Sequence, residues 1–193
     1  MSDDRDQIGY SLEALSAALV GERLKGVRYF DTPCFDVAEL DESWPAEGVH
    51  APAHGIDLVF AARCVGVTWG TEFSRYNIQM VPFSLVDFLL AARFSDVRER
   101  APWADLLGHV IETVSVEWLP RHGDDSTIRF PLALVLGFDN DMDVALAAAA
   151  YRPGDAAAVP GGDDIVVAWR EAQLRTVLPD LQHVADRWAG LST

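Results

Sequence analysis

Short runs in which every second residue is apolar recur along this chain, and they constrain its fold more than any other feature. In the first half the apolar faces are Ile56, Leu58 and Phe60; Val65, Val67 and Trp69; and Ile78 and Met80. In the second half they are Val114, Val116 and Trp118; Leu132, Leu134, Leu136 and Phe138; Val144 and Leu146; and Ile165, Val167 and Trp169. A period of two puts successive side chains on opposite faces of a strand. Successive short runs therefore predict antiparallel strands with one buried face.

The predicted strands cover residues 56–60, 64–69, 76–81, 111–118, 129–138, 142–149 and 164–169, with a further short strand within 24–30. Apolar stripes at helical spacing predict helices over 11–20, 84–94, 102–107 and 179–189. Residues 31–55 lose periodicity and predict a loop region, with room for one short helix over 36–44. The predicted fold class is α+β, with antiparallel sheets and flanking helices.

The 193 residues are long enough for one domain, and we expect a single compact unit over 1–193. An internal repeat is a second hypothesis, because residues 19–27 resemble residues 106–114, which lie 87 positions later. Leu, Gly and Val coincide at three of the nine positions, and both segments follow a predicted helix and lead into a strand. The repeat units would be residues 10–82 and 100–170, as two related helix, strand and hairpin halves.

The charge balance restricts the class of partner. Acidic residues number 30 and basic residues 15, which gives a net charge of −15. A negative field of this size repels phosphate backbones, so nucleic acids and anionic membrane surfaces are not expected as partners. A basic protein would be attracted and steered toward the surface. The amino terminus is polar and acidic, unlike a signal peptide, and a cytoplasmic location is expected.

The sequence offers little sign of catalysis, so no catalytic residue, metal or cofactor is predicted. Cys34 and Cys64 suggest neither a disulfide framework nor a zinc site. The five histidines, His50, His54, His109, His122 and His183, show no metal-binding spacing. Residues 139–143 begin like a calcium loop, but Val144 and Ala150 replace the glycine and glutamate that such a loop needs. They are read as a hairpin turn, with a divalent cation site as the alternative.

The strongest candidate for a binding surface is the stretch between Arg28 and Arg63, which carries acids without any lysine or arginine. The candidate partner-binding residues are Asp31, Phe35, Asp36, Glu39, Asp41, Glu42, Trp44 and Glu47. Aromatic anchors ringed by carboxylates suit a basic protein partner. The alternative is a solvated loop whose Trp44 only pins a short helix to the core. A secondary candidate surface consists of Asp139, Asp141, Asp143, Asp163 and Asp164.

A family resemblance rests on the second half of the chain. Its elements are Pro102-Trp103, Leu106-Leu107-Gly108, a strand that ends in Trp118, the run Leu134-Val135-Leu136-Gly137-Phe138-Asp139, and the run Asp163-Asp164-Ile165-Val166-Val167. This order resembles small bacterial proteins, and similar cytoplasmic proteins of bacterial toxin loci are immunity proteins. The resemblance covers residues 100–170 and implies a protein that binds a cognate toxin and blocks its active site. The matching positions are structural, so no functional residue is carried over.

Two functional hypotheses follow. The first is an acidic protein-binding module of the immunity or antitoxin type that occludes a basic toxin domain. The second is an enzyme or a small-ligand or metal-binding protein that uses Asp139, Asp141, Asp163 and Asp164 gathered between the sheet halves.

Overall fold

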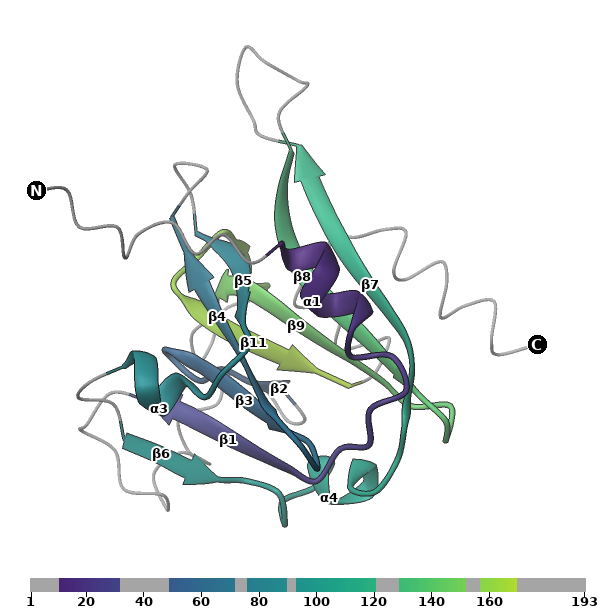
Figure 1. Cartoon of the computed structure of the whole chain (residues 1–193). Helices are drawn as coiled ribbons and strands as arrows, with labels where there is room; N and C mark the ends of the chain where they lie inside the picture. Colours follow the sequence, from purple (N-terminus) through teal and green to yellow (C-terminus); the bar gives the residue numbers. More distant parts are fainter. Residues whose placement is uncertain are drawn as a thin grey trace, which may run out of the picture.

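The computed structural model describes residues 11–31, 49–71, 76–89, 93–120, 129–151 and 157–169. These residues form two antiparallel sheets (Figure 1). The five-stranded sheet has the order β5 (Asn77–Val81), β4 (Cys64–Gly70), β3 (Gly55–Val59), β1 (Gly26–Asp31) and β6 (Arg93–Asp96). The six-stranded sheet has the order β2 (Val49–His50), β11 (Asp164–Ala168), β9 (Asp143–Ala150), β8 (Arg129–Phe138) and β7 (Ile111–Pro120). Its sixth strand, β10 (Val159–Pro160), pairs with β9.

The two sheets pack face to face around one apolar core. The five-stranded sheet contributes Val27, Tyr29, Ile56, Leu58, Val65, Val67, Ile78 and Met80 to this core. The six-stranded sheet contributes Leu134, Leu136, Phe138, Val144, Leu146, Ala148, Ile165 and Val167. Most of these residues belong to the predicted apolar faces, so these faces are confirmed as the ones that form the core. Burial of this area supplies the main favourable free energy of folding.

Strands β8, β9 and β11 of the six-stranded sheet are buried on both faces, which corrects the prediction of one buried face. A second apolar cluster lies on its outer face and includes Val135, Ala145, Ala147, Ala149 and Val166. The alternate positions of β9 are alanines instead of polar residues, so this strand has no face that favours water.

A register shift also moves one predicted core residue to the opposite face. Leu132 was expected to share a face with Leu134, but it belongs to the outer cluster. The pairing of β7 with β8 passes from Glu117 opposite Ala133 to Trp118 opposite Pro131, so β8 has one extra residue at this point. A bulge of one residue reverses the faces that follow it. Trp118, just past the shift, is only partly buried, whereas Trp169 is buried as expected.

Three short helices are found among the described residues. They are α1 (Leu12–Ala17), α3 (Leu85–Phe88) and α4 (Trp103–Leu106), and each is shorter than the helix predicted at its position. Ser11 caps α1 by accepting a hydrogen bond from the Ala14 amide, as its side-chain chemistry predicts. Helix α1 packs against β5 and β7, so it bridges edge strands of the two sheets.

The predicted helix over 84–94 is wrong at its end, because residues 93 and 94 belong to β6. Phe94 pairs opposite Phe30 of β1, and Arg93 pairs opposite Asp31. The start of α3 is fixed by a contact from β3. The Asp57 carboxylate accepts hydrogen bonds from Ser84 Oγ at 2.5 Å and from the Leu85 amide at 2.8 Å. Tertiary contacts at both ends of this segment outweigh its helical pattern.

The two similar segments of the repeat hypothesis lie side by side and antiparallel. The Gly21 amide donates to Ile111 O at 2.8 Å, and the Gly108 amide donates to Leu24 O at 2.8 Å. The Leu24 amide donates to His109 O at 3.0 Å, and the Ile111 amide donates to Glu22 O at 3.0 Å. The two bonds of each pair are equivalent under the shift of 87 positions. The bond from Gly21 corresponds to the bond from Gly108, and the bond from Leu24 corresponds to the bond from Ile111. A helix, a glycine and a meander of strands follow in the same order in each half, and duplication stays a prediction.

The described fold is thus dominated by antiparallel strands, with short flanking helices. The predicted helix over 179–189 and the short helix within 36–44 lie outside the described residues. No helix of the described ranges has the length and apolar character needed to cross a membrane.

The paired glycines provide a test of the equivalence of the two segments. Gly21 and Gly108 have φ values of 86° and 84°, and a Cβ at either would meet no atom within 4 Å. Alanine at each should therefore cost only the left-handed backbone strain, about 1 kcal/mol of unfolding free energy and the same at both sites. Gly26→Ala is the matched control, because its Cβ would make ordinary contact with Val59, and its cost should be near zero. Urea unfolding of the three variants measures these costs, and clearly unequal costs at 21 and 108 would contradict the equivalence.

Candidate functional site

The predicted binding loop begins at the end of one sheet and leads to the other. Asp31 is the last residue of β1, and its backbone pairs with Arg93 of β6. The other seven candidate residues, Phe35, Asp36, Glu39, Asp41, Glu42, Trp44 and Glu47, lie outside the described residues. The chain is described again at β2, which pairs with β11 in the six-stranded sheet. Residues 32–48 therefore connect the two sheets.

The secondary candidate residues do not come together. Asp139 and Asp141 lie in the turn between β8 and β9, and Asp143 begins β9 opposite Gly137. Asp164 pairs with Ala149, near the other end of β9. The acidic turns at 139–143 and 163–164 are thus separated by nearly the whole of this strand, roughly 20 Å. The geometry gives no support to a metal bridged between them.

Exposure divides these carboxylates further. Asp139, Asp141 and Asp163 are exposed, Asp143 is half-buried, and Asp164 is 5% exposed. Among the described residues, no group of three or more His, Cys, Asp and Glu side chains could hold a metal ion. The alternative of a divalent cation site at 139–143 therefore has no support from a ligand group among the described residues.

The turn between β8 and β9 is held in a defined shape, as the hairpin reading predicted. The Phe138 amide donates to Met142 O at 2.9 Å, and the Asp141 amide donates to Phe138 O at 3.2 Å. Asp141 has a φ of 61°, a left-handed conformation that Asp tolerates better than most residues. Asn140 Oδ1 accepts from the Met142 amide at 3.3 Å.

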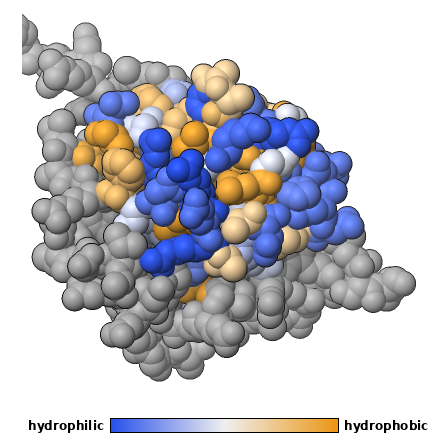
Figure 2. Space-filling view, turned by 90° about the horizontal axis from the view of Figure 1, so that it is seen from below, coloured by the Kyte–Doolittle hydropathy of each residue, from blue (hydrophilic) through white to orange (hydrophobic). Residues whose placement is uncertain are grey.

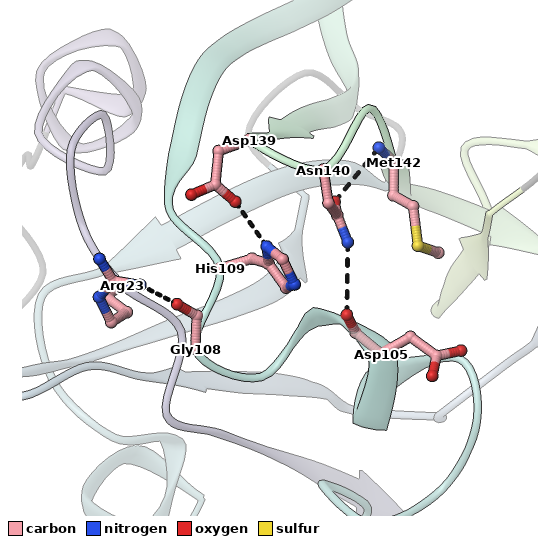
Figure 3. A network of polar contacts seen from close by, with 7 residues as sticks. All are labelled: Arg23, Asp105, Gly108, His109, Asp139, Asn140 and Met142. Atoms are coloured by element: carbon pink, nitrogen blue, oxygen red, sulfur yellow. Dashed lines mark hydrogen bonds and ion pairs between the residues drawn. The ribbon is translucent and has the colours of Figure 1, made fainter.

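A side chain and a backbone carbonyl from two other segments fix this turn from outside (Figure 3). His109 Nδ1 lies 2.6 Å from Asp139 Oδ1, and Asn140 Nδ2 donates to the Asp105 carbonyl at 3.3 Å. Arg23 donates from its guanidinium to the Gly108 carbonyl on the adjoining segment. These contacts join α4, the segment before β7 and the turn into one network, called here the turn network.

The donor and the acceptor of the hydrogen bond between His109 and Asp139 follow from the charge of Asp139. An ionised carboxylate only accepts, so the hydrogen lies on His109 Nδ1 and Nε2 faces away from Asp139. The hydrogen bond from His109 lowers the pKa of Asp139, so its charged form is favoured in the folded protein. Both side chains are partly exposed, at 39% and 33%. The pair holds the turn in place and leaves a carboxylate at the surface.

The turn network lies at the end of the sandwich that also carries α4 (Figure 1). Seen from that end, hydrophilic side chains cover much of the described surface, with hydrophobic ones between them (Figure 2). Asp105, Asp139 and Asp141 are exposed carboxylates of the network. Its arrangement suits contact with a positively charged surface.

Two polar groupings were not predicted from the sequence. The first is the turn network, because the sequence predicted no role for His109. Its position could have been found, because strands starting at 111 and ending at 138 in one antiparallel hairpin bring residue 110 beside 139. The second is a buried contact between Tyr29 and His50 at 2.6 Å. Strand β2, which carries His50, has only two residues and gives no periodic signal.

The described cysteine is not arranged as a nucleophile. Burial, and then the neighbouring Asp57 carboxylate, raise the pKa of the Cys64 thiol to about 12. A thiol of this kind stays protonated near neutral pH and is a poor nucleophile. Cys34 lies outside the described residues.

No family model, curated protein or solved structure matches this chain.

The His109 to Asp139 contact predicts a specific dependence of stability on pH. Because the folded pKa of Asp139 is lowered, its contribution to stability is present above the ordinary pKa of an Asp carboxyl. The contribution is lost as the pH falls through the lowered value. Asp139→Asn should therefore be less stable than the parent at pH 6, and the difference should shrink as the pH falls through the lowered pKa of Asp139. Urea unfolding from pH 6 to strongly acidic pH measures this difference, and a difference that does not change with pH would contradict a stabilising role of the ionised Asp139 carboxylate.

Proposed function

We propose that this chain is an acidic protein-binding module with a basic protein as its partner, of the immunity type that neutralises a cognate bacterial toxin by occluding it. The observation that carries the proposal is the net charge of −15, with twice as many acids as bases. An excess of this size raises the association rate with a cationic protein and weakens binding to nucleic acids. A cytoplasmic location belongs to the same proposal.

The described structure supports a binding role through its rigid, charged turns. Asp139 and Asp141 are exposed on a turn that is fixed by backbone bonds and by His109. Carboxylates held on a rigid scaffold lose little entropy when they pair with a partner's cations. The second hypothesis required carboxylates gathered in one place, and the separation of the two acidic turns by β9 does not favour it.

The first test is binding to the product of a neighbouring toxin gene from the same locus. Association rates should fall steeply between about 50 and 500 mM salt if encounter is electrostatic. A toxin domain that binds without salt dependence, or a locus that encodes no toxin, would contradict the proposal.

Two charge-reversal variants locate the interface. The first changes Glu39, Asp41 and Glu42 of the predicted loop to Lys. The second changes Asp87, Glu99 and Glu112, which are exposed and lie outside both the predicted loop and the turn network, to Lys. Both variants have the same net charge, so a general field effect slows association equally. If the loop is the interface, the first variant should associate about tenfold more slowly than the second and show a weaker salt dependence. Equal rates would move the interface away from the loop.

Trp44→Ala separates an anchor from a structural role. A buried aromatic anchor at an interface contributes about 2 kcal/mol or more, so the dissociation rate should rise by roughly 30-fold. If Trp44 instead pins a helix to the core, the melting temperature falls and the affinity of the folded fraction is unchanged. Surface plasmon resonance and thermal unfolding of this variant distinguish the two roles.

A further inference from the structure

Strand β7 is the longest strand at a sheet end among the described residues. It has ten residues, and β8 is its only strand neighbour in the described part of the six-stranded sheet (Figure 1). The other end strands, β2, β5 and β6, have two, five and four residues. The edge of a strand carries backbone N–H and C=O groups that can pair with another chain.

The two ends of β7 are already occupied by this chain. At its start, the Ile111 amide donates to Glu22 O at 3.0 Å, and the Gly21 amide donates to Ile111 O at 2.8 Å. Near its end, Trp118 O accepts from the Arg129 guanidinium at 3.0 Å. Register shifts also interrupt the pairing with β8 between residues 111 and 113 and between residues 117 and 118. Residues 113–117 are therefore the regular stretch of this strand.

The direction of each backbone group in this stretch follows from the neighbouring hairpin. The Phe138 amide of β8 donates to Met142 O, on the side of β9. Alternate residues of an antiparallel strand direct their backbone groups to opposite neighbours, so Gly137 faces β7, where it lies opposite Thr113. Every second residue from Thr113 to Glu117 therefore bonds to β8.

The two residues between them direct their N–H and C=O groups away from β8. These are Val114 and Val116, and no described strand pairs with them on that side. Their side chains are half-buried and pack against the shared core. The open edge of β7 thus combines unpaired backbone groups with an apolar side.

The first half of the molecule shows how such an edge is filled. The positions 87 residues before Val114 and Val116 are Val27 and Tyr29 of β1. Strand β6 pairs with β1 at these positions: the Val97 amide donates to Val27 O at 3.0 Å, and Ser95 lies opposite Tyr29. The edge of β1 that corresponds to the open edge of β7 therefore carries an added antiparallel strand.

The charge of β7 favours a basic strand in this place. Residues 111–120 contain no lysine or arginine, and Glu117 lies within the open stretch. Opposite charges on neighbouring strands stabilise their pairing, whereas like charges destabilise it. The chain as a whole attracts a cationic segment, because its net charge is −15.

We propose that residues 113–117 of β7 accept an extended strand of the basic partner, in the place that β6 has on β1. The inference rests on the proposed function and adds a second contact to it, apart from the predicted loop. The partner strand pairs with the backbone groups of Val114 and Val116. Its apolar side chains lie beside these two valines and its basic side chains lie beside Glu117, because side chains alternate between the faces of a strand.

Two other occupants of this edge are less favourable on charge. The segment 87 positions before β6 is 6–9, which lies outside the described residues. Residues 1–9 carry three Asp and one Arg, so their charge has the same sign as that of Glu117. A second copy of the chain would bring the same net charge of −15 to the interface.

Amide hydrogen exchange of the free full chain tests whether the edge is open. The amides at 113, 115 and 117 bond to β8, whereas those at 114 and 116 have no strand partner. Protection factors should therefore alternate along the strand and differ by about 100-fold or more. Equal protection along 113–117 would show that the edge is already covered and would overturn the proposal. Sedimentation velocity would then assign the cover to a second copy if the chain is a dimer, or to this chain if it is a monomer.

Two synthetic peptides of equal length test the chemistry of the occupant. One alternates Lys with Val, and the other alternates Glu with Val. The basic peptide should raise the protection at 114 and 116 by about tenfold or more, and the acidic peptide should not. Absence of protection with the basic peptide, or equal protection with both peptides, would overturn the proposal.

Val116→Pro removes one hydrogen-bond donor from the open edge. Because the amide at 116 faces away from β8, the pairing of β7 with β8 should persist, as edge strands tolerate proline at such positions. The basic peptide should no longer protect the amide of Val114 in this variant. Protection of Val114 as in the parent would show that the peptide does not pair with the edge, and would overturn the proposal.

A charge reversal provides an independent variant if Val116→Pro does not fold. Glu117→Lys keeps every backbone group of the edge, so it should lose the protection by the basic peptide and gain protection by the acidic one. Asp87→Lys is the matched control, because it is exposed on α3 and changes the net charge by the same amount. The control should keep the preference of the parent. An equal change in both variants would indicate a general field effect and overturn the role of the edge.

The product of a neighbouring toxin gene separates this inference from the proposed function. Protection of the amides at 114 and 116 in its complex supports both proposals. Binding that leaves both amides unprotected overturns the strand addition and leaves the proposed function intact. A locus without a toxin contradicts the proposed function, while the peptides still test the edge.

Discussion

Four backbone hydrogen bonds between residues 21–24 and 108–111 join the two halves of this molecule, and the rest of the structure is arranged around them. They tie the segment before β1 to the segment before β7. The two meanders that follow therefore start from one point and run into different sheets. The shared core forms between these sheets because each presents one continuous apolar face. The same bonds fix the backbone of His109, which holds the acidic turn through Asp139.

The two halves are similar in outline but differ in the side chains at their helices. At α1 the buried polar residue is Ser16, whose hydroxyl donates to a carbonyl within its own helix. At α4 the corresponding place, 87 positions later, is occupied by Trp103, which donates to Tyr29 across the core. Only the second arrangement extends to His50 and so to β2.

The charge of the chain and its fold act at different levels. The net charge of −15 favours encounter with a cationic protein at any orientation. The fold then limits which carboxylates can act together, since β9 separates the turn at 139–143 from Asp163 and Asp164. The acids of these two turns therefore cannot meet one small site together. The core contributes the rigidity on which a charged surface depends.

The sequence by itself determined the longer strands, because alternation of apolar residues depends only on neighbouring positions, whereas β2, β6 and β10 were not predicted. Strand β8 has the predicted bounds, 129–138, and most predicted strand faces lie in the core. It also determined the charge that restricts the partner. Only the tertiary structure decided where α3 begins and that residues 93 and 94 form a strand. The Asp57 carboxylate binds the Leu85 amide at the start of α3, and β6 pairs with β1. The same holds for the face of Leu132, which one extra residue in β8 reverses. The contact of His50 with Tyr29 and the separation of the acidic turns depend on residues far apart in the chain, and no local pattern records such distances.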